Sequence, residues 1–249
     1  MSLPKYKLLI AYDGTHYGGW QVQPNATSIQ TLVEKALSTA LHTPTKVTGS
    51  GRTDSGVHAL GQVAHFSYEK PIDLKKLCLS LNGLLPPDIR IMSISTAPQD
   101  FHARYSAKGK IYRYYLHPKS FHNPFKRLYS HHLPFLIDLT LLKATASHFI
   151  GTHDFTSFSN EAHRGSASRN AVRTINRLEI IETEDELYVE FEADGFLYKM
   201  VRNIMGTLLD VARGKIPLDQ IPAILNAKDR RLAGACAPPH GLFLVRVIY

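Results

Sequence analysis

Stretches of apolar residues divide the amino-terminal half of the chain into predicted strands and helices. Strands are predicted at an extended run over residues 5–12, near residues 46–50 and 61–68, and at residues 89–95, where apolar and polar residues alternate. Two other stretches repeat apolar residues every three or four positions, as an amphipathic helix does. Thr27 and Gln30 form a predicted capping box before the first helix, and the second is predicted to run from a capping Asp73 to a terminating Gly83. The predicted order is therefore βαββαβ.

The rest of the chain repeats this order. Strands are predicted at residues 110–117, 172–182, 186–194 and 242–249. Helices are predicted over 138–150, before Gly151, and over 197–213, before Gly214. The stretch 118–137 carries several histidines and prolines and is predicted to be a loop. A repeated βαββαβ order is typical of two tandem ferredoxin-like units, which is an α+β fold.

The repeat predicts two halves, residues 1–105 and residues 106–249. Each half is expected to form an antiparallel sheet with its helices. Two such sheets that join edge to edge lose their exposed edges and form one broad sheet. We expect the active-site cleft to lie between the halves, at this junction.

Composition and charge narrow the class of partner. Of the 249 residues, 44% are hydrophobic, and the formal net charge is +8 at pH 7. Spread Lys and Arg residues favour a folded basic face that binds a polyanion. No apolar run approaches the roughly 20 residues that span a bilayer, and no targeting pattern is present, so we expect a cytoplasmic protein. Cys78 and Cys236 stand alone, which is typical of a reducing compartment.

The stretch GRTDSGVHAL, residues 51–60, lies in the connection between two predicted strands. It places one acid, Asp54, between Gly51 and Gly56, with Arg52 two positions earlier. A glycine-rich stretch with an Asp is most often a turn, because Gly tolerates positive φ and Asp bonds its own backbone. The ten residues here exceed the roughly two to five of a tight hairpin loop, which favours a functional loop.

The same stretch, extended to GRTDSGVHALGQVAHF, resembles the signature of the TruA family of tRNA pseudouridine synthases. Ser55 stands where that family usually has Ala. Further blocks resemble the family in the same order, so the resemblance covers nearly the whole chain. They are AYDGTHYGGWQVQ (11–23), FHARYSAKGKIYRYY (101–115), FIGTHDFTSF (149–158), RTI (173–175), GFLYKMVRNIMG (195–206) and GLFLVRVIY (241–249). The loop 159–170 matches no block, and its role stays open.

The resemblance implies an isomerase that acts on the anticodon arm of tRNA, at nucleotides 38, 39 and 40. Such an enzyme detaches uracil from its ribose, turns it, and rejoins it through carbon 5. Because this reaction involves no net redox change, it requires no nicotinamide, flavin or other nucleotide cofactor and no metal. The family resemblance also implies a homodimer, with tRNA as the partner.

Four residues take roles from this resemblance. Asp54 matches the catalytic carboxylate, which either attacks covalently or removes a sugar proton to give a glycal. Arg202, in KMVRN, matches the cation that keeps this carboxylate ionised. Tyr112, in KIYRYY, matches the tyrosine that stacks on the target base, although strand alternation alone does not distinguish it from Tyr114. Arg52 matches the side chain that enters the space left by the extruded base.

Other classes of function fit the sequence less well. A non-catalytic RNA-binding module would use the basic charge and the strand aromatics, but it leaves the Arg-Thr-Asp loop unexplained. A glycosidase usually needs two carboxylates flanking the bond, and only Asp54 stands out. The 13 histidines show none of the usual metal-ligand spacings, and His131 and His132 are adjacent, so we expect no metal site.

Overall fold

The structure is a computed structural model that describes residues 3–160 and 170–249. Most of the loop 159–170, whose role the sequence leaves open, lies outside the described residues. The chain forms two compact units: the first contains residues up to Lys108 together with Phe243–Tyr249, and the second contains Gly109–Leu242. The sequence predicts this division between residues 105 and 106. The final strand, predicted in the second half, is instead grouped with the first unit, where it pairs with a strand of that unit.

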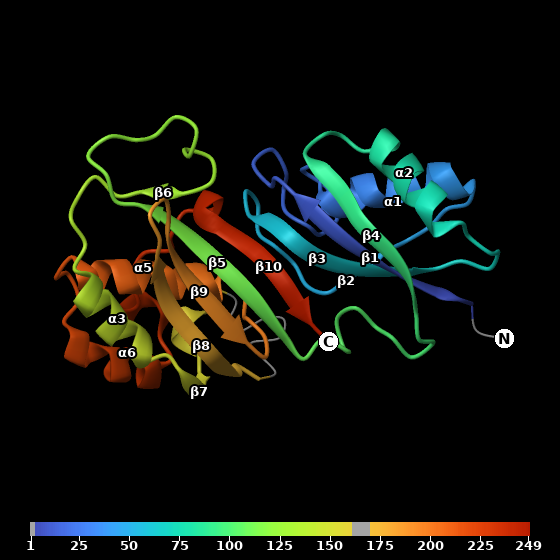
Figure 1. The fold of residues 1–249 in the computed structure, drawn as a ribbon. Helices are drawn as coiled ribbons and strands as arrows, with labels where there is room; N and C mark the ends of the chain where they lie inside the picture. Colours follow the sequence, from blue (N-terminus) through green and yellow to red (C-terminus); the bar gives the residue numbers. More distant parts are fainter. Residues whose placement is uncertain (1–2, 161–169) are drawn as a thin grey trace. The chain divides into compact units, whose positions relative to one another are not determined.

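The first unit has the βαββαβ order that the sequence predicts. Its elements are β1 (Lys5–Tyr12), α1 (Ile29–Leu41), β2 (Thr48–Gly49), β3 (His58–Ser67), α2 (Leu74–Leu84) and β4 (Ile89–Ala97), with β10 (Leu242–Ile248) added. The strands follow the order β4-β1-β3-β10, and β2 pairs with β3. Strand β1 is antiparallel to both of its neighbours, whereas β10 runs parallel to β3. Helices α1 and α2 lie together on one face of these strands (Figure 1).

The second unit is also a layer of mainly antiparallel strands with helices, in which only the short β6 is parallel to its neighbour among the described strands. Its strands are β5 (Gly109–His117), β6 (His131–His132), β7 (Gly151–Asp154), β8 (Val172–Glu182) and β9 (Leu187–Ala193). Its helices are α3 (Leu139–Ser147), α5 (Met200–Ala212) and α6 (Ile221–Ala227). Single turns of 3-10 helix span Thr156–Phe158, Leu218–Gln220, Arg230–Leu232 and Pro239–Gly241. The strand order is β5-β9-β8-β7, and β6 pairs with β5. The α+β fold class is thus confirmed.

Alternation of side chains explains why these residues form sheets with one buried face. Along β1, every second residue from Tyr6 to Tyr12 is buried, and the residues between them are partly exposed. The largest fully buried side chains form a core in each unit. They are Leu8, Ile10, Trp20, Ile29, Leu37, Phe66 and Leu81 in the first unit, and Tyr114, Phe149, Phe155, Phe158 and Phe191 in the second. Burying each large aliphatic side chain contributes about 1.5–3 kcal/mol, so these layers hold the loops that follow.

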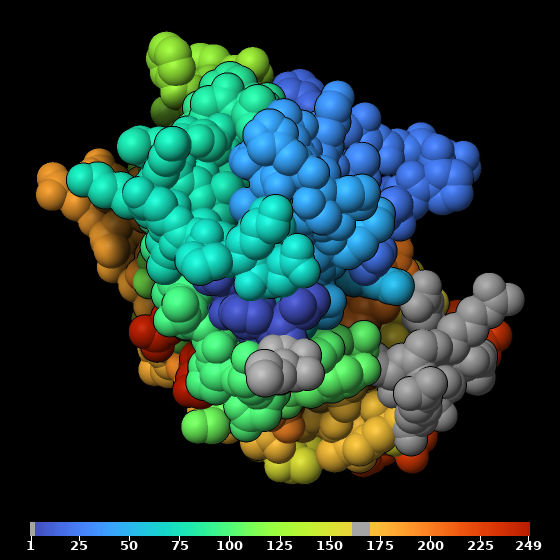
Figure 2. Space-filling model, turned by 90° about the vertical axis from the view of Figure 1, so that its right-hand side faces the viewer, coloured from blue at the N-terminus to red at the C-terminus, as the bar shows by residue number. Residues whose placement is uncertain are grey.

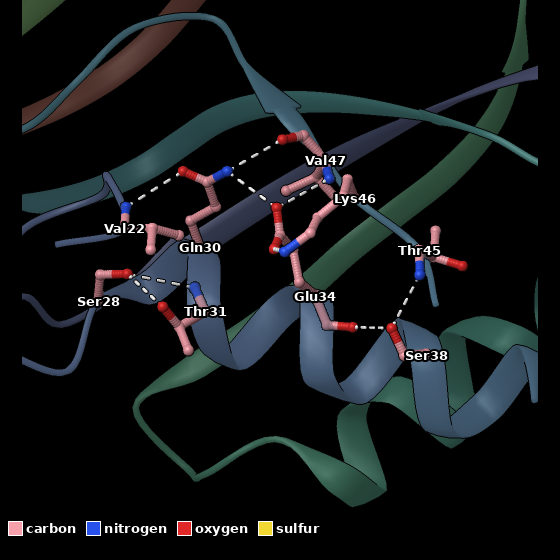
Figure 3. Close-up of polar contacts among 9 residues, drawn as sticks. All are labelled: Val22, Ser28, Gln30, Thr31, Glu34, Ser38, Thr45, Lys46 and Val47. Atoms are coloured by element: carbon pink, nitrogen blue, oxygen red, sulfur yellow. Dashed lines mark hydrogen bonds and ion pairs between the residues drawn. The ribbon is translucent and has the colours of Figure 1, made fainter. Parts of the chain in front are cut away.

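The start of α1 differs from the prediction by one residue. Ser28, not Thr27, is the N-cap, and its Oγ accepts the N–H of Thr31 at 3.2 Å (Figure 3). Gln30 does not complete a capping box, because its Oε1 accepts the N–H of Val22 at 3.3 Å, while its Nε2 donates to Glu34 and to the Val47 carbonyl. Thr27 belongs to the preceding loop, where its carbonyl accepts the N–H of Gly18 at 2.9 Å.

A buried carboxylate ties α1 to the segment before β2. Glu34 has an exposed fraction of only 7%, and it accepts hydrogen bonds from Gln30 and from the main-chain N–H of Val47 (Figure 3). The ammonium of Lys46 forms an ion pair with Glu34 Oε2 at 2.9 Å. Because a buried charge is costly unless it is paired and hydrogen-bonded, these donors allow Glu34 to lie among apolar residues.

Several predicted boundaries are wrong for local reasons. Asp73 caps α2 as predicted, but the helix passes through Gly83 and ends at Leu84. Leu85 is extended because it precedes a proline, which disfavours helical backbone. Gly151, with φ of 107°, does not stop a helix but opens the unpredicted strand β7. Helix α5 begins at Met200, because Lys199 takes a left-handed backbone conformation.

The cap geometry makes a direct prediction about stability. Ser28→Ala should lower the free energy of unfolding by about 1 kcal/mol, because the N–H of Thr31 loses its side-chain acceptor. Chemical denaturation followed by circular dichroism measures this difference. Thr27→Ala is the matched control and should change stability by much less, because Thr27 is exposed and lies outside the helix. Equal losses for both variants would contradict the assignment of Ser28 as the cap.

Candidate active site

The loop that carries Asp54 is fixed at its start by a buried glutamine of β3. Gln62 Oε1 accepts the hydroxyl of Ser50 at 2.7 Å, and Gln62 Nε2 donates to the carbonyl of Gly51 at 3.1 Å. The main-chain N–H of Ser50 also donates to the carbonyl of Val63 at 2.7 Å. These bonds hold the first residues of the loop against the strand that follows it.

A turn of main-chain atoms follows Asp54. The N–H of Val57 donates to the carbonyl of Asp54 at 3.1 Å, and Gly56 has a φ of 75°. Positive φ at the third position of such a turn favours glycine, which explains why Gly56 stands there. The turn interpretation of the sequence is correct for this bond, but the carbonyl of Asp54 makes it, not the carboxylate. Asp54 itself is half-buried.

The residue between Arg52 and Asp54 points into the first unit. Thr53 is buried, and its hydroxyl lies 2.8 Å from the hydroxyl of Tyr12. The carbonyl of Thr53 accepts the N–H of Trp20 at 3.2 Å. Burial raises the pKa of Tyr12, despite its hydrogen bond to Thr53, so this hydroxyl stays protonated. Arg52, by contrast, is exposed on the same loop.

A glycine-rich segment supports the loop from the other side. Gly19 has a φ of 90°, and a Cβ there would collide with the carbonyl oxygen of Thr53. The carbonyl of Tyr17 accepts the N–H of Gly56 at 3.3 Å and the hydroxyl of Ser55 at 3.1 Å. The serine that replaces the family's usual alanine thus makes a bond of its own. The glycines of DGTHYGGW are the sequence signal for this support, whose contact with the loop the sequence analysis did not predict.

Tyr112 and Tyr114 lie on the same face of β5, as strand alternation predicts, but their surroundings differ. Tyr112 has an exposed fraction of 7%, and its ring meets that of Phe196 edge to face at 5.1 Å. Tyr114 is fully buried, and its hydroxyl donates to the carbonyl of Pro238 at 2.9 Å. Burial raises the pKa of Tyr114, so this donor keeps its proton. Tyr114 therefore has a structural role, a difference from Tyr112 that strand periodicity alone does not predict.

Arg202 lies in the first turn of α5, in the second unit. Its guanidinium Nε donates to the carbonyl of Ala237 at 2.8 Å, and its own carbonyl accepts the N–H of Ala237 at 3.0 Å. Tyr114 and Arg202 are thus both bonded to the segment 237–238. A side chain held through Nε has its planar guanidinium oriented, because the fork is rigid.

The segment around Ala235 rests directly on the backbone of α5. A Cβ on Gly206 would collide with the carbonyl oxygen of Ala235. The hydroxyl of Thr207 accepts the N–H of Gly234 at 2.9 Å, and the same hydroxyl donates to the carbonyl of Asn203. Sequence reasoning missed these positioning residues, although Gly206 lies inside the family block GFLYKMVRNIMG.

The four predicted site residues therefore fall into two sets. Arg52 and Asp54 share one loop of the first unit, whereas Tyr112 and Arg202 lie on β5 and α5 of the second. Within residues 3–160 and 170–249, no three His, Cys, Asp or Glu side chains are grouped so that they could hold a metal ion. None of the helices in these ranges combines the length and the apolar character needed to cross a membrane.

Comparison with known proteins gives this arrangement a family. A family model described as tRNA pseudouridine synthase matches residues 8–106 and 145–249. The chain is 57% identical to tRNA pseudouridine synthase A 1 of Protochlamydia amoebophila over 245 residues, which cover 98% of this chain and 96% of that protein. It is 45% identical to tRNA pseudouridine synthase A of Exiguobacterium sibiricum, with 98% and 96% covered. It is 43% identical to the protein of that name from Thermoanaerobacter sp., with 97% and 98% covered.

Both the family match and these relatives extend over most of the chain. Pseudouridine synthases are isomerases. The chain belongs to the tRNA pseudouridine synthase family.

The backbone contact at α5 can be tested by adding one methyl group. Gly206→Ala should lower the free energy of unfolding by about 1–3 kcal/mol, because the new Cβ overpacks against Ala235. Gly83→Ala is the matched control, since Gly83 is also helical but a Cβ there meets nothing within 4 Å. It should raise stability by up to about 1 kcal/mol through helix propensity. Thermal and urea unfolding measure both, and a neutral Gly206→Ala would disprove the close approach.

Proposed function

We propose that this protein converts uridine to pseudouridine in the anticodon arm of tRNA, at nucleotides 38, 39 and 40. The observation that supports this most is Asp54 on its anchored loop, in a chain that matches the family over most of its length. In this reaction the bond between ribose C1′ and uracil N1 breaks, and a bond between C1′ and C5 forms. N1 gains a proton and C5 loses one, so the product is an isomer of the substrate.

Asp54 supplies the carboxylate in this proposal, as nucleophile or as the base that removes a ribose proton. Either role requires the group to be held still while the base detaches and turns. The bonds of Gln62 and Tyr17 to the loop, and the turn closed by Val57, provide that support. Because these partners are main-chain or buried groups, the loop is built before substrate arrives.

Arg202 and Tyr112 complete the chemistry in this proposal. Arg202 is the cation that favours the ionised form of the catalytic carboxylate, and the bond to Ala237 orients its guanidinium. Tyr112 is the ring that stacks on the target base, and Phe196 fixes that ring from its edge. Both assignments come from the family resemblance, and these local contacts support them.

Arg52 has a different role, the extrusion of the target nucleotide. Taking a base out of a stack costs a few kcal/mol, and a side chain that occupies the vacated space offsets part of that cost. Arg52 is exposed and lies two residues before Asp54 on the same loop. A guanidinium can stack on bases and bond phosphates at once, which an ammonium cannot.

The partner in this proposal is tRNA, and the net charge of +8 favours such a polyanion. From the same resemblance we propose that the protein is a homodimer and that it works in the cytoplasm. Sedimentation velocity on the purified protein tests whether it is a dimer. No nucleotide cofactor takes part. The alternative, an RNA-binding module without catalysis, makes no use of the carboxylate of Asp54.

Removal of the carboxylate separates the enzyme from the binding module. Asp54→Asn keeps the side-chain size but removes the charge and the nucleophilicity, so pseudouridine formation on an unmodified tRNA transcript should fall to background. Binding of tRNA should persist or strengthen, because a negative charge near a polyanion is lost. Mass spectrometry of the product and fluorescence anisotropy with labelled tRNA measure the two effects.

Asp73→Asn is the control for this experiment. It makes the same change at the N-cap of α2, where Asn caps nearly as well, so activity should stay at the parental level. A folded Asp54→Asn protein that still isomerises uridine at more than a trace rate would show that the loop is structural only.

The extrusion role predicts a separate effect at Arg52. Arg52→Lys keeps the positive charge but loses the planar fork, so single-turnover isomerisation at saturating protein should slow by at least about tenfold, while tRNA affinity changes little. Arg127→Lys provides the control, because Arg127 lies outside the loop and should show no such loss. Parental turnover by the Arg52→Lys protein would remove Arg52 from this step.

A further inference from the structure

A row of aromatic rings crosses the first unit at the far end of β3 from the Asp54 loop. The ring centroids of Tyr105 and His102 are 4.3 Å apart, and those of His102 and His65 are 5.0 Å apart. The ring centroids of His65 and Phe101 are 6.0 Å apart, and those of Phe101 and Tyr249 are 5.0 Å apart. We refer to these five residues as the aromatic ladder. Its two ends differ, because Tyr249 is half-buried whereas Tyr105 is exposed.

The turn that carries Tyr105 is closed by its own hydrogen bonds. His102 Nδ1 accepts the N–H groups of Arg104 and Tyr105 at 3.1 and 3.2 Å. The N–H of His102 donates to the hydroxyl of Ser106, and the N–H of Ser106 donates back to the carbonyl of His102. His65 Nδ1 accepts the N–H of Ala103, which ties the turn to β3. The ring of Tyr105 is therefore presented on a rigid support.

Positive charges flank the aromatic ladder. Lys7 lies opposite His65 in the pairing of β1 with β3, so both side chains occupy the same face of the sheet. The ammonium of Lys7 is 6.0 Å from the ring centre of Phe101, and Lys5 Nζ donates to the Phe101 carbonyl at 2.9 Å. The guanidinium of Arg104 is 5.8 Å from the ring centre of Tyr105.

The amino-terminal strand and the segment that follows β4 lie next to each other (Figure 2). Figure 2 shows the dark-blue amino-terminal strand and the green segment that follows β4 side by side on the face turned to the viewer, in agreement with the bond from Lys5 to Phe101. Asp100, next to Phe101, is the acid of this segment. With Lys108 of the same segment, four Lys and Arg side chains and one acidic side chain are found among these neighbours.

Tyr105 is the unusual member of the ladder, because 78% of its surface is exposed although one side of its ring faces His102. An aromatic ring that is rigid, exposed and flanked by cations has the chemistry of a stacking platform for a nucleic-acid base. We propose that Tyr105, supported by His102 and accompanied by Arg104, stacks on a nucleotide of the tRNA outside the one that reacts. This inference rests on the proposed function.

The spacing along β3 separates this contact from the reaction. The strand begins at His58, just after the Asp54 loop, and His65 lies seven residues further along it. At about 3.3 Å per residue, the ladder lies about 23 Å along the strand from the start of β3. A contact at this distance adds affinity for the tRNA without taking part in bond breaking.

The half-buried end of the ladder has a structural role that the exposed end lacks. The hydroxyl of Tyr249 donates to the carbonyl of Ala103 at 2.7 Å, so Tyr249 fastens the end of the chain to this turn. Loss of Tyr249 would therefore damage the fold. Tyr105 offers a cleaner test, because removing an exposed ring leaves the bonds of its turn in place.

Tyr105→Ala should weaken binding of an unmodified tRNA transcript by at least about fivefold, as expected for the loss of one stacked base. Tyr105→Phe should bind within about twofold of the parent, because the ring remains. Arg104→Ala should reduce the dependence of the logarithm of affinity on the logarithm of salt by about one. Leu79→Ala is the matched control, since it removes an exposed apolar side chain, 68% exposed, from α2 of the same unit. It should not change tRNA affinity.

The measurements are anisotropy with labelled tRNA, single-turnover pseudouridine formation at saturating protein, and sedimentation velocity. The proposal predicts weaker binding by Tyr105→Ala with an unchanged single-turnover rate. A folded Tyr105→Ala protein that binds tRNA like the parent, while the parent makes pseudouridine, overturns the platform and leaves the proposed function intact. A variant that changes the oligomeric state instead assigns Tyr105 to a protein contact and also overturns it.

A parent that binds tRNA but never isomerises uridine refutes the proposed function, and the comparison of tRNA binding by the parent and Tyr105→Ala then still decides the platform. A parent that binds no tRNA overturns both.

Discussion

Contact of main chain with main chain, made possible by glycine, holds both parts of the candidate site. Gly19 lets the segment after β1 approach the carbonyl of Thr53, next to Asp54. Gly206 lets the segment that binds Arg202 lie on the backbone of α5. Contacts made through side chains with several rotatable bonds would allow the two segments to shift, whereas backbone packed directly on backbone has little freedom to move. Asp54 directly follows the contact at Thr53, and Arg202 precedes the contact at Gly206 by a few positions.

Buried polar groups add direction to this close packing. Gln62, Thr53 and Tyr12 hold the loop of Asp54, and the hydroxyl of Tyr114 holds the segment that also binds Arg202. A buried polar group without its partner costs about 1–3 kcal/mol, so each of these bonds opposes any shift of the segment that it holds. The apolar core sets the positions of the strands, and these few polar bonds then set the loops.

The sequence predicts the long, strongly patterned elements well and the short ones poorly. The alternation in β1 predicts that strand at its observed bounds, β8 lies at residues 172–182 as predicted, and Asp73 is a unique cap candidate before α2. Thr27 and Ser28 are adjacent cap candidates, so the loop contact of Thr27 decides between them. Strand β7 has four residues, too few for a pattern, and Glu34 looks like a surface charge until its donors are known.

The candidate site shows the same limit. The sequence alone identifies a ten-residue connection that contains Arg52 and Asp54, because this feature depends only on residues adjacent in the sequence. The support from Gly19 and the bond between Arg202 and Ala237 join residues about 35 apart along the chain, and no local pattern encodes such pairs. The roles of Arg52, Asp54, Tyr112 and Arg202 therefore all stay predictions.

The parallel pairing of β10 with β3 has a consequence for the order in which the molecule is made. Residues 243–249 belong to the first unit, yet a ribosome adds them only after the whole of the second unit. Until then, the β3 side of the first sheet lacks a neighbour, and the turn at Ala103 lacks its bond from Tyr249. An unpaired edge invites wrong partners, and contacts between distant residues form slowly. The first unit therefore cannot complete its sheet until residues 243–249 have been synthesised. A chain truncated before these residues would lack one strand of the first unit, although most of that unit is synthesised first.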